Sequence, residues 1–142
     1  YYTKLDRMNP PNFSCKIEMF CSVNPSEDPQ KIKNAISNIF PQSNIKIENF
    51  SVTADSDDLQ SIEKIYETIH SKKSQRIYKR YLEKNLQNNT TWFYLNKQAA
   101  FAHKVAICEE AEESPLGPIK VFLTSSNIDR IIDWLVFGTD EN

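Results

Sequence analysis

Glycine is nearly missing from this chain, and its scarcity excludes whole classes of nucleotide-binding site. The 142 residues include two glycines, Gly117 and Gly138. A dinucleotide-binding fingerprint and a P-loop each need several glycines in one loop, where the backbone approaches a phosphate closely. The common nucleotide-hydrolysing enzymes are therefore excluded.

Long hydrophobic runs and paired cysteines are missing as well. No stretch approaches the roughly eighteen consecutive apolar residues that span a membrane, and no secretory signal pattern is present. The three cysteines have no C-x-x-C spacing. Cys15 and Cys21 are in phase on one predicted strand and too far apart to bond, so we expect buried, reduced thiols. These features predict a cytoplasmic protein without a membrane segment.

Histidine is too sparse to suggest a metal site. Neither His70 nor His103 has a second ligand at metal-site spacing. The acidic run at 109–113 is typical of a solvent-exposed loop, with a site for a hard cation as the alternative. No serine or cysteine lies in a nucleophile-like turn. We therefore expect no catalytic residue, no metal and no cofactor, and predict that the protein is not an enzyme.

The hydrophobic pattern, in contrast, is rich. Residues 13–23 alternate apolar and polar side chains, as in a half-buried strand, and 45–54, 91–95, 103–108 and 119–123 are also β-prone. A phase slip near Asn49 indicates a bulge or a tight hairpin. Helical spacing of apolar residues covers 32–40, 59–69, 77–86 and 128–136.

This order of elements predicts a single α+β domain over residues 13–137. We expect a two-layer sandwich in which helices cover one face of a largely antiparallel sheet. Residues 1–12 are predicted to be a disordered leader or residues foreign to the natural chain, and residues 138–142 a frayed tail.

Charge is distributed very unevenly along the chain. The overall net charge is −2, yet residues 70–104 hold eight basic residues against Glu83 alone, about +7, and the rest of the chain has about −9. The basic residues are Lys72, Lys73, Arg76, Lys79, Arg80, Lys84, Lys97 and Lys104. Such a patch on an otherwise acidic protein indicates an anionic partner, most often nucleic acid.

Spacing within the patch supports this interpretation. Arg76, Lys79, Arg80 and Lys84 follow one another at i, i+3, i+4 and i+8, so one helix face presents them all. A face of this kind can follow a phosphate backbone. The alternative is a solvated helix face whose charges pair with carboxylates of neighbouring elements.

The segment that follows the basic helix adds aromatic and amide groups. If the side chains at 91–95 alternate between the two faces of a strand, Trp92 and Tyr94 share one face. One of the two faces could then be exposed as a stacking platform for bases. A strand covered on both sides is the alternative. Next to it, Asn96 and Gln98 could donate hydrogen bonds to base edges or 2′-hydroxyl groups, with Lys97 among the phosphate contacts.

Two hexapeptides carry a resemblance to a known family. Asn96-Lys97-Gln98-Ala99-Ala100-Phe101 and Ser114-Pro115-Leu116-Gly117-Pro118-Ile119 resemble the archaeal uncharacterised protein family number two hundred and one, also labelled an RNA-binding family. The segments Val23 to Asp28 and Ile131 to Leu135 also resemble this family in their general pattern. The resemblance implies a fold like that of the ribosomal protein that binds five-S RNA, a homodimer, and an association with an ATPase-like domain related to dephospho-CoA kinase.

Two functions follow as hypotheses. The first is a non-catalytic RNA-binding or RNA-associated protein that uses the basic helix and the adjacent strand. The alternative is a homodimeric protein-interaction or accessory module for a nucleotide-binding, dephospho-CoA-kinase-like enzyme. In that case the acidic loop of one chain would dock on the basic helix of another.

Overall fold

The alternating segment near the start of the chain forms a central strand of a six-stranded antiparallel sheet. In the computed structural model, which describes residues 10–138, the strands are β1 (Lys16–Ser22), β2 (Asn44–Ile47), β3 (Ser51–Ser56), β4 (Thr90–Leu95), β5 (Ile107–Cys108) and β6 (Ile119–Thr124). Their order across the sheet is β2-β3-β1-β6-β4-β5. The predicted leader at 1–12 and tail at 138–142 lie mostly outside the described residues.

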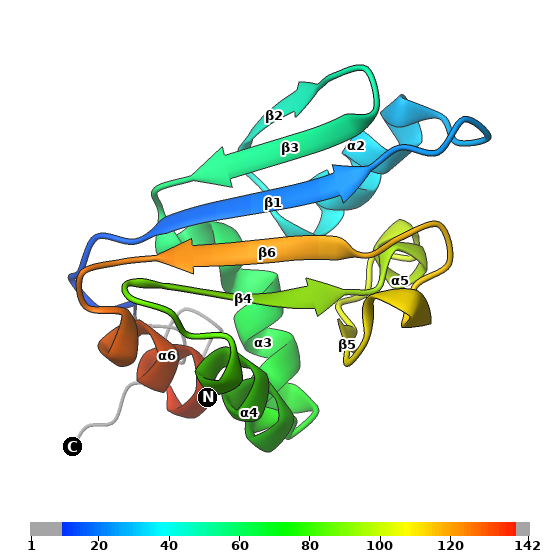
Figure 1. The fold of residues 1–142 in the computed structure, drawn as a ribbon. Coiled ribbons are helices and arrows are strands. Elements are labelled where there is room, and N and C mark those ends of the chain that lie inside the picture. The colour runs from blue at the N-terminus through cyan, green and yellow to red at the C-terminus, as the bar shows by residue number, and fades with distance from the viewer. Residues whose placement is uncertain (1–9, 139–142) are drawn as a thin grey trace, which may run out of the picture.

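Helices cover one face of this sheet (Figure 1). They are α2 (Pro29–Ile39), α3 (Glu63–Ser71), α4 (Gln75–Lys84), α5 (Lys97–Phe101) and α6 (Ile128–Phe137), with 3₁₀ turns η1 (Leu59–Ile62) and η2 (Ala111–Glu113). This arrangement confirms the predicted α+β sandwich with helices on one face. None of the helices within residues 10–138 has the length and apolar character needed to cross a membrane.

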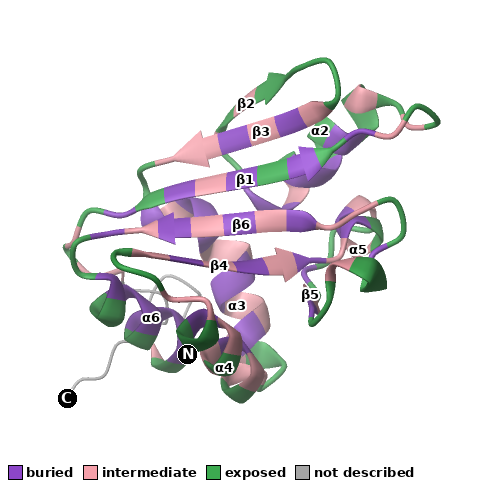
Figure 2. Cartoon of the chain, in the orientation of Figure 1, coloured by how far each residue is buried: buried purple, intermediate pink, exposed green. Residues whose placement is uncertain are grey.

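The hydrophobic core fills the space between the sheet and the helices (Figure 2). Ile17, Met19 and Cys21 of β1 point into it, and so do alternate residues of β3, β4 and β6. The apolar faces of the helices close it from the other side. The intervening strand residues therefore lie on the open face of the sheet, where Phe20 is 45% exposed.

The phase slip near Asn49 is a hairpin. Strands β2 and β3 pair in antiparallel register, with Ile47 opposite Val52. The Glu48 amide donates a hydrogen bond to the carbonyl of Ser51 at 2.8 Å, which closes the turn. Of the two interpretations that the sequence left open, the hairpin is the correct one.

The segment after β4 differs from the prediction. Residues 97–101 form a short helix that the sequence did not reveal, because five residues are too few to show helical periodicity. The Asn96 side chain caps it by accepting a hydrogen bond from the Ala99 amide at 2.9 Å. The predicted strand at 103–108 was wrong over 103–106: His103 turns the chain with φ +65°, and strand pairing is limited to Ile107 and Cys108.

Cys15 and Cys21 are buried, as predicted, Cys108 is buried as well, and none of the three is in a disulfide. Burial raises the pKa of each thiol from its ordinary value of 9.0 to about 11. Because the thiolate is the nucleophilic form, these protonated groups are poor nucleophiles at neutral pH.

Candidate nucleic-acid interface

Helix α4 is anchored by its apolar side and presents cations on the other. Tyr78 and Leu82 are buried in the core. Three exposed residues form what we call the α4 cation row: Arg76, Arg80 and Lys84. Lys79 lies beside the row, half-buried, with its ammonium 2.8 Å from a carboxylate oxygen of Glu83. Within residues 10–138, no carboxylate lies at ion-pair distance from the row itself.

The α4 cation row is regular in spacing. Its members are four residues apart, so the row extends along about 12 Å of the helix axis, at about 1.5 Å per residue. The guanidinium carbon of Arg80 lies 5.2 Å from the centroid of the Tyr81 ring, and the Lys84 ammonium 5.6 Å. Both distances suit cation–π contacts, which hold the two charges near the surface without neutralising them.

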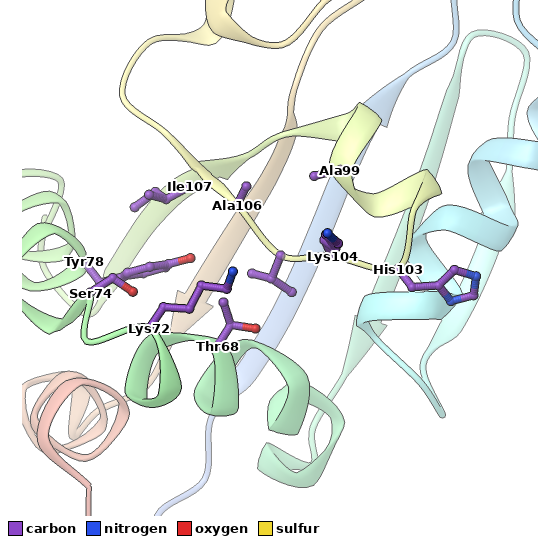
Figure 3. Close-up of a pocket in the computed structure, with 10 residues that line it drawn as sticks. Thr68, Lys72, Ser74, Tyr78, Ala99, His103, Lys104, Ala106 and Ile107 are labelled. Atoms are coloured by element: carbon purple, nitrogen blue, oxygen red, sulfur yellow. The ribbon is translucent and has the colours of Figure 1, made fainter.

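A pocket of about 410 Å³ lies where α3 meets α4 (Figure 3). Lys72 and Lys104 line it, and no carboxylate does. The Lys72 and Tyr78 side chains point into the pocket, whereas the imidazole of His103 points away from it (Figure 3). Burial raises the pKa of the Tyr78 hydroxyl, which stays a neutral hydrogen-bonding group. The pocket therefore extends the cationic surface from α4 toward the loop after α5.

Lys97 is a predicted RNA contact that the fold places in the interior, so that prediction was wrong. Its side chain is fully buried, and its ammonium lies 3.0 Å from the Glu27 carboxylate. It also donates hydrogen bonds to the carbonyls of Ser22 at 3.0 Å and Leu116 at 2.7 Å. An ammonium enclosed by these partners cannot reach a phosphate.

The Glu27 carboxyl is ionised at neutral pH. Burial raises the pKa of the Glu27 carboxyl, but hydrogen bonds from Asn24 and the Lys97 ammonium outweigh it, and the pKa lies below its ordinary value of 4.5.

The remaining predicted contacts lie at the junction of α3 and α4 and on the segment around α5, which borders the same pocket. Lys73 is exposed at the junction of α3 and α4, where its φ is +54°. Gln98 is exposed on α5, and Asn96 is half-buried with its side-chain oxygen committed to the α5 cap. Asn96 therefore serves the fold, while Gln98 and Lys73 stay available at the surface.

The open face of the sheet carries an aromatic cluster centred on a lysine. On β4, Trp92 and Tyr94 lie on the open face and Phe93 and Leu95 in the core. The rings of Trp92 and Tyr94 are 5.0 Å apart at 57°. The Lys120 ammonium of β6 lies 4.2 Å from the Trp92 centroid, 5.0 Å from Phe122 and 5.8 Å from Tyr94. We call these four residues the aromatic face.

Sequence reasoning missed Lys120 and Phe122. The basic surface was predicted from the excess of positive charge in residues 70–104, and Lys120 lies outside that segment. The signal was nevertheless present, because Ile119, Val121 and Leu123 are the buried residues of β6 and the residues between them must face the other way. Strand pairing then brings Phe122 opposite Trp92 and Lys120 opposite Tyr94.

A crevice of about 40 Å³ connects the α4 cation row with the aromatic face. It is lined by Tyr81, Lys84, Asn85, Trp92, Phe93, Tyr94, Cys108 and Glu109. The Asn85 side chain donates a hydrogen bond to the Trp92 carbonyl at 2.9 Å, at the edge of β4 that α4 borders. Lys84, at the end of the α4 cation row, therefore meets Trp92 and Tyr94 at this edge of the sheet, although α4 and the rings lie on opposite faces of it.

Within residues 10–138, no three histidine, cysteine or acidic side chains come together in a group that could hold a metal ion. His70 donates a hydrogen bond from Nε2 to the Leu135 carbonyl at 2.9 Å. Burial lowers the pKa of this imidazole, so it is neutral at pH 7 and serves the contact between α3 and α6. The acidic run at 109–113 is a mostly exposed loop.

Comparison with known proteins gives a consistent result. A family model described as "RNA binding" matches residues 16–124. A UPF0201 protein of Methanothermobacter thermautotrophicus is 38% identical over 122 residues, which cover 84% of this chain and 89% of the relative. A UPF0201 protein of Sulfurisphaera tokodaii is 39% identical over 124 residues, 84% of this chain and 86% of the relative.

Solved structures agree with these sequence relatives. The crystal structure of a UPF0201 protein from Methanococcus jannaschii superposes with a TM-score of 0.74 at 29% identity and covers 89% of this chain and 99% of that one. A second UPF0201 crystal structure gives 0.73 at 27% identity, over 89% of this chain and 97% of that one. The resemblance in the two hexapeptides is thereby confirmed, and the chain belongs to the UPF0201 family, whose matching model is described as RNA binding.

Proposed function

We propose that this protein is a non-catalytic RNA-binding protein that holds phosphate groups on the α4 cation row. The observation that carries the proposal is that Arg76, Arg80 and Lys84 are exposed and have no carboxylate partner within residues 10–138. Three unpaired cations in a row on a chain with a net charge of −2 form a local positive field that attracts anionic partners. The "RNA binding" description of the family model supports the same function.

The neighbouring cations enlarge this surface. Lys72 and Lys104 at the pocket, together with Lys73, continue the α4 cation row toward the junction of α3 and α4. Lys79 contributes less, because Glu83 already neutralises it. Affinity that arises from phosphate contacts falls steeply with salt, since each neutralised phosphate releases counterions.

The test is a charge reversal on α4 with a matched control. Arg76→Glu with Arg80→Glu is expected to lower the affinity for a labelled pool of hairpin RNAs at least tenfold. The slope of log affinity against log salt should decrease by about 1.5, because two phosphate contacts are lost at about 0.7 to 0.9 each. Fluorescence anisotropy at several salt concentrations measures both quantities.

The control reverses the same number of positive charges on a different helix. Lys31→Glu with Lys33→Glu reverses two exposed cations on α2, away from α4. It should change the affinity less than threefold, and both variants should melt like the wild type. Absence of RNA binding by the wild type at low salt, or an equal loss in the control, would overturn the proposal. Shortening of the bound RNA during incubation would contradict the non-catalytic part.

A further inference from the structure

The aromatic face is an unusual surface for a soluble sheet. Its three rings belong to Trp92, Tyr94 and Phe122, and all are partly exposed on the side of the sheet that no described helix covers (Figure 1). Phe20 of β1 lies next to them, paired in register with Lys120. Aromatic side chains gathered in a partly exposed group, rather than scattered singly, are a feature of binding surfaces.

The position of Lys120 gives the surface its chemical character. Its ammonium lies within 6 Å of three ring centroids. No carboxylate within residues 10–138 is at ion-pair distance from it. The rings hold the cation by their quadrupoles and leave its charge uncompensated. An occupant of this face must therefore combine an apolar, flat surface with negative charge, as a nucleotide does.

The surroundings restrict where such an occupant can lie. On the far side of the aromatic face, strand pairing brings Glu18 of β1 opposite Phe122 and also opposite Asp55 of β3. Lys16 lies 4.0 Å from Glu18 and offsets part of its charge, whereas no cation within residues 10–138 is at ion-pair distance from Asp55. The two carboxylates together disfavour a phosphate on this side. On the near side, the crevice with Tyr81 and Lys84 leads to the α4 cation row. The charge pattern thus directs a nucleic-acid backbone along α4 and its bases toward β4 and β6.

From these observations we infer that the aromatic face binds unpaired bases of a single-stranded RNA segment whose backbone lies along the α4 cation row. The inference rests on the proposed function and narrows it to a substrate class. In a duplex the base faces are stacked on one another and cannot reach a protein ring. In a single strand each base offers a free π-face, and stacking on aromatic side chains is the usual mode of recognition.

The test compares single-stranded and duplex RNA. Trp92→Leu with Tyr94→Leu is expected to lower the affinity for a twelve-nucleotide oligouridine at least tenfold, and for a twelve-base-pair RNA duplex less than twofold. Trp92→Phe alone should keep most of the single-strand affinity, because a ring is restored. Phe50→Ala, which removes a ring that is 75% exposed on the β2–β3 turn, is the matched control and should change neither affinity.

A second readout uses the unmodified protein. The chain has two tryptophans, and Trp134 is buried at 4% exposure, so quenching by an added oligonucleotide reports mainly on Trp92. We expect quenching by oligouridine and little by the duplex. This measurement holds even where the double substitution disturbs folding.

The outcomes separate the two proposals. Both proposals are supported if Arg76→Glu with Arg80→Glu lowers the affinity for single-stranded and for duplex RNA, and if the aromatic variant lowers the affinity for single-stranded RNA alone. Unchanged single-strand affinity in a folded aromatic variant, or no quenching, overturns the stacking inference and leaves the α4 function intact. An aromatic variant that turns a dimer into a monomer without weakening RNA binding would also overturn it, since the face would then join two copies of the chain.

Discussion

The buried ion pair of Lys97 and Glu27 gives the two hexapeptides a structural role that needs no ligand. Their side chains are 0% and 8% exposed. The pair and its hydrogen bonds join three stretches that are distant in sequence: 22–27, 96–97 and 114–117. Because the ammonium is satisfied by main-chain carbonyls as well as by the carboxylate, the two hexapeptides fix the connection between β1, α5 and the loop before β6.

The residue-scale prediction follows from that burial. Lys97→Met removes the cation and leaves the Glu27 carboxylate buried without its partner, which costs about 3–5 kcal/mol in comparable cases. We expect the free energy of unfolding in urea to decrease by about that amount. The double variant Lys97→Met with Glu27→Gln should recover part of the loss, because no charge is then left unpaired.

A matched substitution separates this effect from a general effect of methionine. Lys33→Met replaces an exposed lysine of α2 and should change stability by no more than about 0.5 kcal/mol. If Lys97→Met were as mild as Lys33→Met, the ion pair would not be a stabilising element of the fold.

At the scale of elements, α4 is held on β4 by polar contacts as well as by its apolar side. The Thr91 hydroxyl donates a buried hydrogen bond to the Leu82 carbonyl at 2.5 Å. Asn85, the residue after α4, donates a hydrogen bond from its side-chain amide to the Trp92 carbonyl. These two hydrogen bonds hold the C-terminal end of α4 beside β4. They therefore set the distance between Lys84 on the helix and Trp92 on the strand.

Thr91→Val tests the first of these bonds. Valine keeps the shape of the side chain but leaves the Leu82 carbonyl without the hydroxyl, so we expect a loss of about 1–2 kcal/mol in the free energy of unfolding. Thr53→Val, on the open face of β3, is the control and should be nearly neutral. Equal stabilities of the two variants in chemical denaturation would contradict this role of Thr91.

The sequence predicts those helices and strands that are long enough for a hydrophobic period to be recognised. Strand β1 and helices α2 and α6 each show a clear period because one face of each is buried. Helix α5 and strand β5 are too short to show a period; the capping residue Asn96 is the main signal of α5, and β5 was predicted only as part of a longer strand at 103–108. Burial of Lys97 could not be predicted, since its partner Glu27 lies 70 residues away in sequence.

For the candidate interface the same distinction holds. The cations of α4 were predictable because local spacing places them on one helix face. The cluster of Trp92, Lys120 and Phe122 arises from pairing between β4 and β6, whose register the sequence does not reveal. Contacts within one element are thus predicted well, and contacts between elements require the fold.

On the scale of the whole molecule, the distribution of charge matters more than the net charge of −2. Lys97 is removed from the basic surface by burial, which leaves α4 and its flanking lysines as the positive region. The acidic loop at 109–113 borders that region, and Glu109 lines the crevice with Lys84 and Trp92. A carboxylate at this position opposes the approach of phosphates and restricts the strength of binding.

Glu109→Gln is therefore expected to strengthen binding. Removing this carboxylate from the crevice should raise the affinity for single-stranded RNA about twofold to fivefold at low salt, and the gain should vanish near 1 M salt, where the screening length is about 3 Å. Glu48→Gln on the β2–β3 turn makes the same change in net charge and should have little effect. An equal gain in Glu48→Gln would mean that net charge alone governs affinity. A loss in Glu109→Gln would mean that the carboxylate accepts hydrogen bonds from the RNA, and the path through the crevice would have to be redrawn.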